Sequence, residues 1–351
     1  MKTKWLVDLS NTLKLNDEIL VIASSGARSR GLIEKIESIS GIHIVKVVDD
    51  IPSLPDTEYL SILIKEVRKL RFSRILAIGG GSVIDSAKFI KGVINYKTFF
   101  DFNKIEDFSP DSLQTFPNLI AIPTTAGSGS EATHFGTIWD RGSKRKLSIS
   151  HTKLLPDIVI HDSNLLKTLS YENLLYPAVD SISHCLDSIW NRNANKTSVE
   201  FAIKSLNYSI QAFKSQGGLN LDPSTLKSLQ VSSFLSGKAI NITKTSISHS
   251  ISYPLTINFN VPHGLAVGFS LPAIFQFVNQ IINLEKNELA VIEKSIKVIE
   301  RLNLIDKLSN YCNFNQIIDL IPQMFNSHRS NNSIRVFNSK DVHDVLINSF
   351  K

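Results

Sequence analysis

One aspartate and three histidines in the second half of the chain have the residue types and spacing of a metal site. Asp180 and His184 are four residues apart in a helical pattern, so their side chains lie on one face, one turn apart. His249 lies in a second helical stretch, predicted over residues 243–252, and His263 opens a third. One carboxylate and three imidazoles suit a divalent transition metal such as Fe²⁺ or Zn²⁺.

The same four residues also have simpler explanations. An Asp–His pair at this spacing is more often a local hydrogen bond than half of a metal site. A single histidine on a helix is usually a polar side chain with one partner. The spacing alone therefore leaves both interpretations open.

A glycine-rich turn in the first half of the chain has the pattern of a phosphate-binding loop. Gly79-Gly80-Gly81-Ser82 follows a predicted strand and precedes a predicted helix over residues 83–94. Glycines let the backbone approach a pyrophosphate, and the helix N-terminus supplies unpaired N–H groups. A tight strand-to-helix turn needs glycine in any case. Asp85, in the first turn of the helix, either complements the helix dipole or contacts the cofactor.

A second loop, PTTAGSGSE over residues 123–131, also follows a predicted strand. Its small and hydroxyl-bearing residues suit hydrogen bonds to phosphate or ribose. Ligands of open α/β sheets bind at the carboxyl ends of the strands. Two such loops in one sheet therefore favour a dinucleotide site more strongly than either loop alone.

The elements that position these residues change in type along the chain. Apolar segments typical of buried strands lie at residues 18–23, 42–48, 74–78, 119–122 and 158–160. Amphipathic stretches such as residues 57–70 separate them, which predicts a parallel sheet with helices on both faces. After Ser163 the pattern is helical, as at residues 199–215 and 284–304. We expect an α/β domain over residues 1–165 and an all-helical domain over residues 166–351.

Composition is that of an ordinary soluble globular protein. Of the 351 residues, 42% are hydrophobic and 20% are charged. The two cysteines, Cys185 and Cys312, do not make a disulfide framework. No run approaches the roughly 20 apolar residues that span a bilayer, and Asp8 interrupts the start where a signal peptide would be apolar. We expect a cytoplasmic protein without a membrane partner.

The net charge of +6 raises the question of nucleic acid. The densest basic cluster comprises Lys65, Arg68, Lys69, Arg71 and Arg74. Its spacing is that of the solvated face of a helix that leads into a strand. We expect no nucleic-acid partner, because a phosphate-rich cofactor or an anionic substrate explains a mild excess equally well.

Five motifs resemble the iron-containing alcohol dehydrogenases, relatives of dehydroquinate synthase and glycerol dehydrogenase. They lie in the family's order over nearly the whole chain, at residues 79–88, 123–133, 155–162, 178–188 and 261–272. The resemblance implies a Rossmann-like N-terminal domain and a helical C-terminal domain. It also implies a catalytic metal, Fe²⁺ or else Zn²⁺, and NADPH or NADH as the hydride carrier.

The resemblance implies roles for individual residues. The implied metal ligands are Asp180, His184, His249 and His263. The implied cofactor contacts are Gly80, Gly81, Ser82, Thr124, Thr125, Ser128 and Lys146. Many members carry a non-ligand histidine where this chain has Tyr253. That departure puts a histidine proton relay in doubt and makes Tyr253, a metal-shell water or the cofactor ribose the candidate proton donor.

Residues 132–140, 188–195 and 238–256 further resemble the phosphonoacetaldehyde reductase subgroup. This resemblance implies reduction of phosphonoacetaldehyde to 2-hydroxyethylphosphonate. A general short-chain alcohol dehydrogenase, acting on lactaldehyde or a diol, is the alternative. A dehydroquinate-synthase-like lyase would need several cationic residues around its substrate. The segment around His249 is instead rich in Ile, Ser and Tyr, which argues against a lyase.

An anionic aldehyde requires donors near the metal. If residues 238–249 formed one continuous helix, Thr245 and Ser246 would lie one turn before His249. Lys238 would lie about three turns before it, and Lys244 would lie on the far side of that helix. The predicted substrate residues are Phe135, Arg192, Asn195, Thr245 and Ser246. They have a simpler explanation as packing or solvated residues.

The residues after the first strand bear on the choice of nicotinamide. NAD-selective enzymes usually place an acid where it holds the ribose 2′-hydroxyl. Here Ser24 and Ser25 are neutral, and Arg28 and Arg30 are suited to pair with a 2′-phosphate or simply to face water. We expect Ser24 and Ser25 to contact the cofactor, NADPH to be accepted or preferred, and the enzyme to be a homodimer.

Overall fold

The computed structural model describes residues 3–96, 101–102, 105, 108–110, 115–215, 217–325 and 331–351. The chain forms two compact units. The first unit comprises Met1–Thr125 and Ser130–Leu165, and the second comprises Ala126–Gly129 and Leu166–Lys351. Among the described residues, no helix is both long and apolar enough to cross a membrane.

The first unit contains a five-stranded parallel sheet in the order β2-β1-β3-β4-β7. The strands are β1 (Glu18–Ala23), β2 (His43–Val48), β3 (Arg74–Gly79), β4 (Asn118–Pro123) and β7 (Ile158–Val159). Each coincides with one of the apolar segments. The predicted parallel α/β fold is therefore confirmed.

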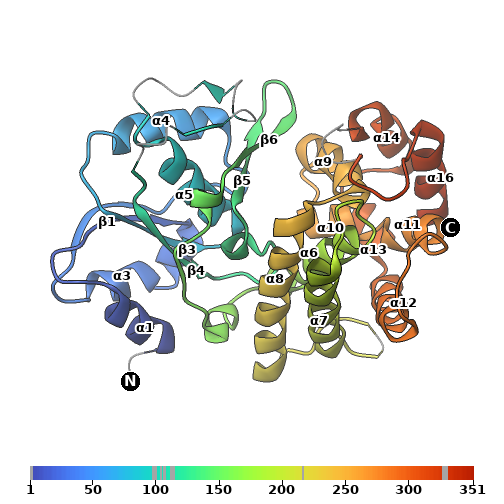
Figure 1. The fold of residues 1–351 in the computed structure, drawn as a ribbon, viewed down its shortest axis with the longest axis horizontal. Coiled ribbons are helices and arrows are strands. Elements are labelled where there is room, and N and C mark those ends of the chain that lie inside the picture. The colour runs from blue at the N-terminus through green and yellow to red at the C-terminus, as the bar shows by residue number, and fades with distance from the viewer. Residues whose placement is uncertain are drawn as a thin grey trace. The chain divides into compact units, whose positions relative to one another are not determined.

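Helices cover both faces of this sheet (Figure 1). Ile19 and Val21 of β1 pack with α1 (Lys4–Thr12) and α3 (Leu32–Glu37). Leu20 and Ile22, which point the opposite way, pack with α4 (Thr57–Val67) and α5 (Gly81–Val93). Because successive strand residues face opposite sides, a strand buried on both sides reads as a continuous apolar run.

An antiparallel hairpin in the first unit was not predicted. It consists of β5 (Phe135–Asp140) and β6 (Arg145–Ser150). The fully buried Lys88 of α5 anchors its start, because Nζ donates to the carbonyl oxygens of Ser130 at 2.6 Å and Phe135 at 2.7 Å. Burial lowers the pKa of Lys88 to about 8, although Asp85 and Glu131 act to raise it.

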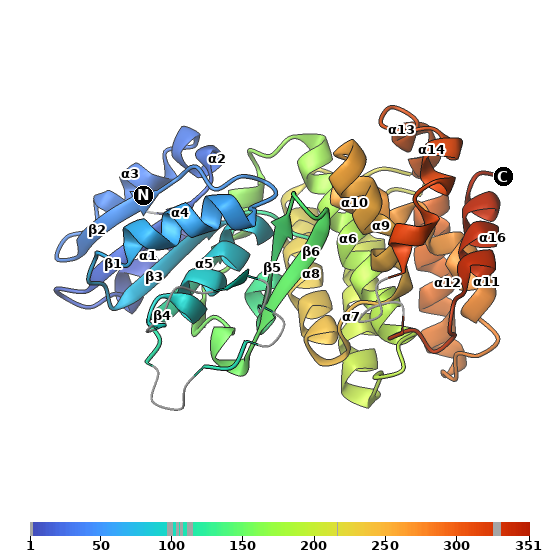
Figure 2. The same ribbon diagram turned by 90° about the horizontal axis from the view of Figure 1, so that it is seen from above.

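The second unit is helical, as predicted. Its first three long helices, α6 (Tyr171–Ile189), α7 (Lys196–Ala212) and α8 (Pro223–Thr243), lie side by side (Figure 2). The following helices are α9 (Ile247–Phe259), α10 (His263–Gly268), α11 (Leu271–Val278), α12 (Lys286–Glu300), α13 (Leu304–Leu308), α14 (Phe314–Ile318) and α16 (Ser339–Ser349). The described residues also include the short 3₁₀ helices η2 (Ser130–Ala132), η3 (Thr152–Leu154), η4 (Ser163–Leu166) and η5 (Ile321–Met324).

Capping side chains set where these helices begin. Ser170, Asn195 and Asp222 each accept a backbone N–H in the first turn of α6, α7 and α8. Such caps satisfy donors that the helix itself leaves unpaired. The helix expected over residues 199–215 therefore begins earlier, at Lys196, immediately after its cap.

The helix predicted over residues 243–252 is wrong at its start. Lys244 has a φ of 63°, which ends α8, and α9 begins only at Ile247. Residues 244–246 thus form a linker between two helices rather than one turn of a single helix. Lys238 lies on α8, so its expected spacing of three turns before His249 does not hold.

Candidate active site

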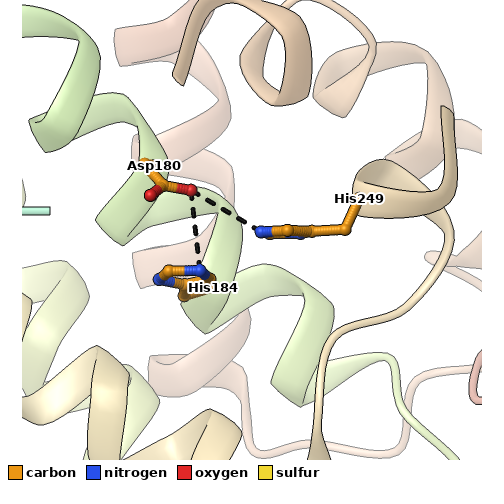
Figure 3. Close-up of side chains that lie close together, drawn as sticks. All are labelled: Asp180, His184 and His249. Carbon is orange, nitrogen blue, oxygen red and sulfur yellow. Dashed lines mark ion pairs between the residues drawn. The ribbon is translucent and has the colours of Figure 1, made fainter. Parts of the chain in front are cut away.

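Three side chains from two helices converge in the second unit (Figure 3). Asp180 and His184 come from adjacent turns of α6, and His249 comes from α9. Oδ1 of Asp180 lies 3.5 Å from Nε2 of His184 and 3.6 Å from Nε2 of His249. Nε2 of His263, at the start of α10, lies 3.8 Å from the same oxygen. The structure therefore brings together all four residues that the sequence singled out.

These distances fit a shared ion better than direct hydrogen bonds. They exceed the usual limit of about 3.2 Å for an N–H···O bond. Ligand atoms that lie about 2.1 Å from a tetrahedral ion are about 3.4 Å apart. Oδ1 of Asp180 and Nε2 of His249 are buried and have no hydrogen-bond partner among the residues that the structure describes. Since buried polar atoms are rarely left unpaired, these residues fit a divalent metal.

The electrostatics of the cluster favour a cation. Burial raises the pKa of Asp180, but His184, His263 and His249 outweigh it and hold this pKa well below its ordinary value. Burial lowers the pKa of His249, whereas Tyr253, Asp180 and Asp187 raise it, to about 9 overall. The carboxylate is thus ionised, as a metal ligand must be.

A fifth residue, Asp187, was missed by the sequence analysis. It is fully buried, and its Oδ2 lies 2.8 Å from Nδ1 of His249. Burial raises the pKa of Asp187, but hydrogen bonds led by that from His249 lower it to about 2. Asp187 follows His184 by three residues in α6, so the spacing that placed Asp180 and His184 on one face also includes it.

Tyr253 lies beside the histidines. Its ring stacks on His263 with centroids 5.9 Å apart and planes 9° apart, and it meets His249 edge-on at 6.2 Å. Only 7% of the residue is exposed. A phenol in this position is suited to exchange a proton with a group bound near the imidazoles.

The glycine-rich turn and the start of the second loop meet at the ends of neighbouring strands in the first unit. Gly80 precedes α5, whose first residues are Gly81 and Ser82, and the amide of Thr124 donates to the carbonyl of Gly79 at 2.9 Å. A Cβ atom at Gly80 would lie 2.9 Å from Oγ1 of Thr125. The glycine therefore keeps open the space in front of the helix N-terminus, where a pyrophosphate binds in such folds.

The chain matches two family models in succession. Residues 3–163 match the model for iron-containing alcohol dehydrogenase. Residues 175–346 match the C-terminal model of the Fe-containing alcohol dehydrogenase family. The chain belongs to the iron-containing alcohol dehydrogenase family. Nicotinamide dinucleotides and a divalent metal are the cofactors of this family, and the enzyme class predicted from sequence is confirmed.

Several known proteins are similar to this chain in sequence or in structure. A phosphonoacetaldehyde reductase of Streptomyces viridochromogenes is 27% identical over 77% of this chain and 69% of its own length. An NADPH-dependent butanol dehydrogenase of Clostridium saccharobutylicum is 26% identical over 88% of this chain and 79% of its own length. The iron-containing alcohol dehydrogenase of Thermococcus thioreducens superposes with a TM-score of 0.83 at 19% identity, covering 99% of this chain and 97% of the other.

In this family member, the glycines of the second loop also serve packing. Ala126–Gly129 belongs to the second unit, where Oγ of Ser181 donates to the carbonyl of Gly127 at 3.1 Å. A Cβ atom at Gly129 would lie 2.5 Å from Cα of Gly237 in α8. The half-buried Ser128 lies between these two glycines. Packing against helices therefore explains the glycines without any reference to phosphate.

Three predicted ligand contacts have other partners in the first unit. Asp85 accepts hydrogen bonds from the hydroxyl of Ser130 and from the amide of Thr137, so its carboxylate fastens α5 to the hairpin. Lys146 lies over the ring of Trp139 at 5.9 Å, across the hairpin. The carbonyl of Phe135 accepts from Lys88, and its ring meets His134 edge-on at 5.8 Å.

The segment after β1 forms the short helix α2 (Ser25–Ser29), with Ser24 at its N-cap. Arg28 pairs with Asp49 and Glu34. Arg30 donates to the carbonyls of Gly26 at 2.8 Å and Leu165 at 3.0 Å. Both guanidinium groups already have protein partners, so a 2′-phosphate would have to share Arg28 with two carboxylates.

Two of the predicted substrate residues form hydrogen bonds within the protein. Ser246 is fully buried, and both its amide and its hydroxyl donate to Asp187 at 2.8 Å. Asn195 caps α7 by accepting from the amide of Ser198 at 3.0 Å. Contact of Ser246 and Asn195 with a substrate stays a prediction, and these bonds also give both residues a structural role.

The other predicted contacts of the second unit differ in exposure. Nζ of Lys238 lies between the rings of Phe201, at 5.2 Å, and Phe234, at 4.8 Å, so it is bound to α7 rather than to the α8–α9 linker. Thr245 is nearly buried, whereas Arg192 is exposed. Arg192 remains the predicted contact with an accessible charge.

Proposed function

We propose that this enzyme reduces a small anionic aldehyde to a primary alcohol, with phosphonoacetaldehyde as the leading substrate and 2-hydroxyethylphosphonate as the product. The observation that carries the reaction type is the convergence of buried Asp180, His184 and His249 and half-buried His263 on one oxygen of Asp180, which has no hydrogen-bond partner among the described residues. The substrate is supported by the relative that reduces phosphonoacetaldehyde, which aligns with 77% of this chain.

Each group of the chain has a distinct task in this reaction. A bound divalent metal polarises a carbonyl oxygen, and a reduced nicotinamide supplies the hydride. Asp180 and the three histidines hold the metal. Gly80, Gly81 and the N-terminus of α5 bind the pyrophosphate of the cofactor. Tyr253 donates a proton to the oxygen of the product, so that the product leaves as an alcohol rather than as an alkoxide.

Two exposed cations of the second unit, Arg192 and Lys244, lie on segments that are hydrogen-bonded through a common residue, and they support recognition of an anion. Asn332 joins the end of α6 to the α8–α9 linker: its carbonyl accepts from the amide of Arg192 at 2.7 Å, and its side chain donates to the carbonyl of Thr245 at 2.9 Å. Asn191 adds a bond of 3.3 Å to the carbonyl of Lys244. Arg192 and Lys244 are both exposed, and Lys244 lies five residues before His249. Because residues 244–246 are not helical, Lys244 need not lie on the side of a helix that faces away from His249.

A general short-chain alcohol dehydrogenase is the second candidate. It is favoured by the butanol dehydrogenase relative, which aligns with 88% of this chain. Such an enzyme has no use for cations beside its metal. The two candidates therefore differ in how strongly a negative charge on the aldehyde raises the rate.

The test compares kcat/KM for phosphonoacetaldehyde, propionaldehyde and lactaldehyde in the iron-reconstituted enzyme. A charge-assisted hydrogen bond contributes about 1.5–3 kcal/mol, so phosphonoacetaldehyde is expected to be favoured roughly 10- to 100-fold. Replacing Arg192 and Lys244 together by alanine should remove that advantage and leave propionaldehyde reduction unchanged. Lys227→Ala, which removes an exposed lysine of α8, is the control. Equal rates for charged and uncharged aldehydes would establish the general alcohol dehydrogenase instead.

A further inference from the structure

The buried carboxylate of Asp187 contacts one of the metal-binding histidines from behind. Its Oδ2 lies 2.8 Å from Nδ1 of His249, on the side of the ring opposite to Asp180. We propose that Asp187 is a positioning residue, which holds a proton on Nδ1 of His249 and thereby directs Nε2 to the metal. This inference rests on the proposed metal-dependent function.

The chemistry of imidazole makes the direction of this bond definite. A neutral imidazole carries one N–H, and an ionised carboxylate only accepts. When a metal replaces the proton on Nε2 of His249, the proton on Nδ1 stays, because it is donated to Asp187, and Nε2 then offers its lone pair. That nitrogen lies 3.6 Å from Oδ1 of Asp180 and, within the described part of the chain, has no hydrogen-bond partner. An acidic partner behind a histidine ligand fixes its tautomer and raises its basicity toward a metal.

Asp187 is itself held rigidly, so it can serve as a fixed reference point. Oδ2 also accepts from the amide of Ser246 at 2.8 Å. Oδ1 accepts from the hydroxyl of Ser246 at 2.8 Å, from Nε1 of Trp190 at 2.9 Å and from the amide of Ser248 at 3.3 Å. Five donors from three segments surround a side chain with no exposed surface. The carboxylate of Asp187 is therefore held against rotation and away from water.

The same bonds place the backbone that carries His249. Ser246 and Ser248 flank the start of α9, and Lys244 just before them has a φ of 63°. Asp187 thus anchors to α6 the first turn of the helix that bears the histidine. Since α6 also supplies Asp180 and His184, one helix controls all three residues, two directly and the third through Asp187.

A purely structural role makes a different prediction, so the test must separate the two. Asp187→Asn keeps the shape but removes the charge, and Ser246→Ala removes one of the five donors without touching the bond to His249. Both variants are expected to lower the melting temperature. Only Asp187→Asn should weaken Zn²⁺ binding to the metal-free protein, by roughly 10- to 100-fold in a chelator competition. Ser246→Ala should stay within about threefold of the wild type, and Asp187→Glu should recover most of the affinity that Asp187→Asn loses.

A second measurement needs no variant. In the zinc-loaded wild type, ¹⁵N-edited NMR should show His249 protonated on Nδ1 and bound to zinc through Nε2. Zinc on Nδ1, wild-type affinity in Asp187→Asn, or an equal loss in Ser246→Ala would overturn the role of Asp187 alone. A wild-type protein that binds no divalent metal would overturn the proposed function together with this inference.

Discussion

Gly264 lies directly against the carbonyl oxygen of Tyr176, so closely that a Cβ atom on the glycine would come within 1.8 Å of that oxygen. The contact joins the start of α10 to α6, in the second unit. Tyr176 is one turn before Asp180, and His263 immediately precedes Gly264. This close approach of two backbones is what lets His263 and Asp180 reach the same point.

Gly264→Ala should therefore disturb the metal site without altering any ligand. Overpacking against a backbone atom costs about 1–3 kcal/mol, so the midpoint of chemical unfolding should fall and metal content should drop. Gly26→Ala is the matched control, because its Cβ atom would meet nothing closer than 3.7 Å. A Gly264→Ala protein with wild-type stability and full metal content would contradict this account.

Removing one ligand should empty the site. His263→Ala or Asp180→Ala is expected to lose bound metal and nearly all turnover, because three remaining ligands hold a divalent ion much less firmly. Metal content by elemental analysis and aldehyde reduction are the measurements. His343→Ala removes an exposed histidine of α16 and should change neither. Stoichiometric metal and full activity in either ligand variant would show that the ion, if any, binds elsewhere.

Tyr253→Phe should separate proton transfer from metal binding. The phenylalanine keeps the stack on His263 but loses the hydroxyl, so kcat is expected to fall roughly 100-fold while metal content stays at the wild-type level. Tyr208→Phe, at an exposed tyrosine of α7, is the control. If kcat stays within about twofold of the wild type, water or the cofactor ribose supplies the proton.

Arg28 provides a test of nicotinamide preference. With neutral Ser24 and Ser25 beside it, we expect NADPH to be used at least as well as NADH. Arg28→Ala should raise KM for NADPH by roughly tenfold, since one charge-assisted bond is lost, and leave KM for NADH unchanged. Arg141→Ala, in the loop of the hairpin, is the control. A preference of the wild type for NADH of about tenfold or more would refute the expectation.

Lys88 makes stability depend on pH in a definite direction. Its pKa falls from 10.5 to about 8 on burial, so between these values the unfolded chain binds more protons than the folded one. The free energy of unfolding should therefore rise with pH, by about 1–2 kcal/mol from this group between about pH 7.5 and 9.5.

Comparison with Lys88→Met isolates this contribution, because other groups titrate alike in both proteins. The methionine removes the Nζ donor to the oxygens of Ser130, Thr133 and Phe135, so the variant should be less stable throughout. The stability difference between wild type and variant should widen as pH rises in urea denaturation. A difference that is flat or narrows with pH would show that the buried amine is not held at a lowered pKa.

Local periodicity in the sequence determined the strands of the sheet and the placement of two metal-site residues on one helix face. Apolar runs located β1, β2, β3, β4 and β7 because a strand buried on both faces needs apolar side chains at every position. The spacing of Asp180 and His184 placed both on one face of α6 because side chains four residues apart in a helix lie one above the other. These rules relate residues that are close together in the chain, so they can be applied to the sequence alone.

Tertiary structure decided the rest. The break at Lys244 sets where α9 begins, the bond from His249 to Asp187 joins residues 62 positions apart, and Gly129 is required by its contact with Gly237 rather than only by a phosphate. Ser246 and Asn195, which the sequence suggests as substrate contacts, also form hydrogen bonds within the protein. These outcomes depend on which distant segments meet, and periodicity along the chain does not encode that. Hydrogen bonds and close contacts between segments far apart in sequence therefore select, from several chemically suitable residues, those that form the site.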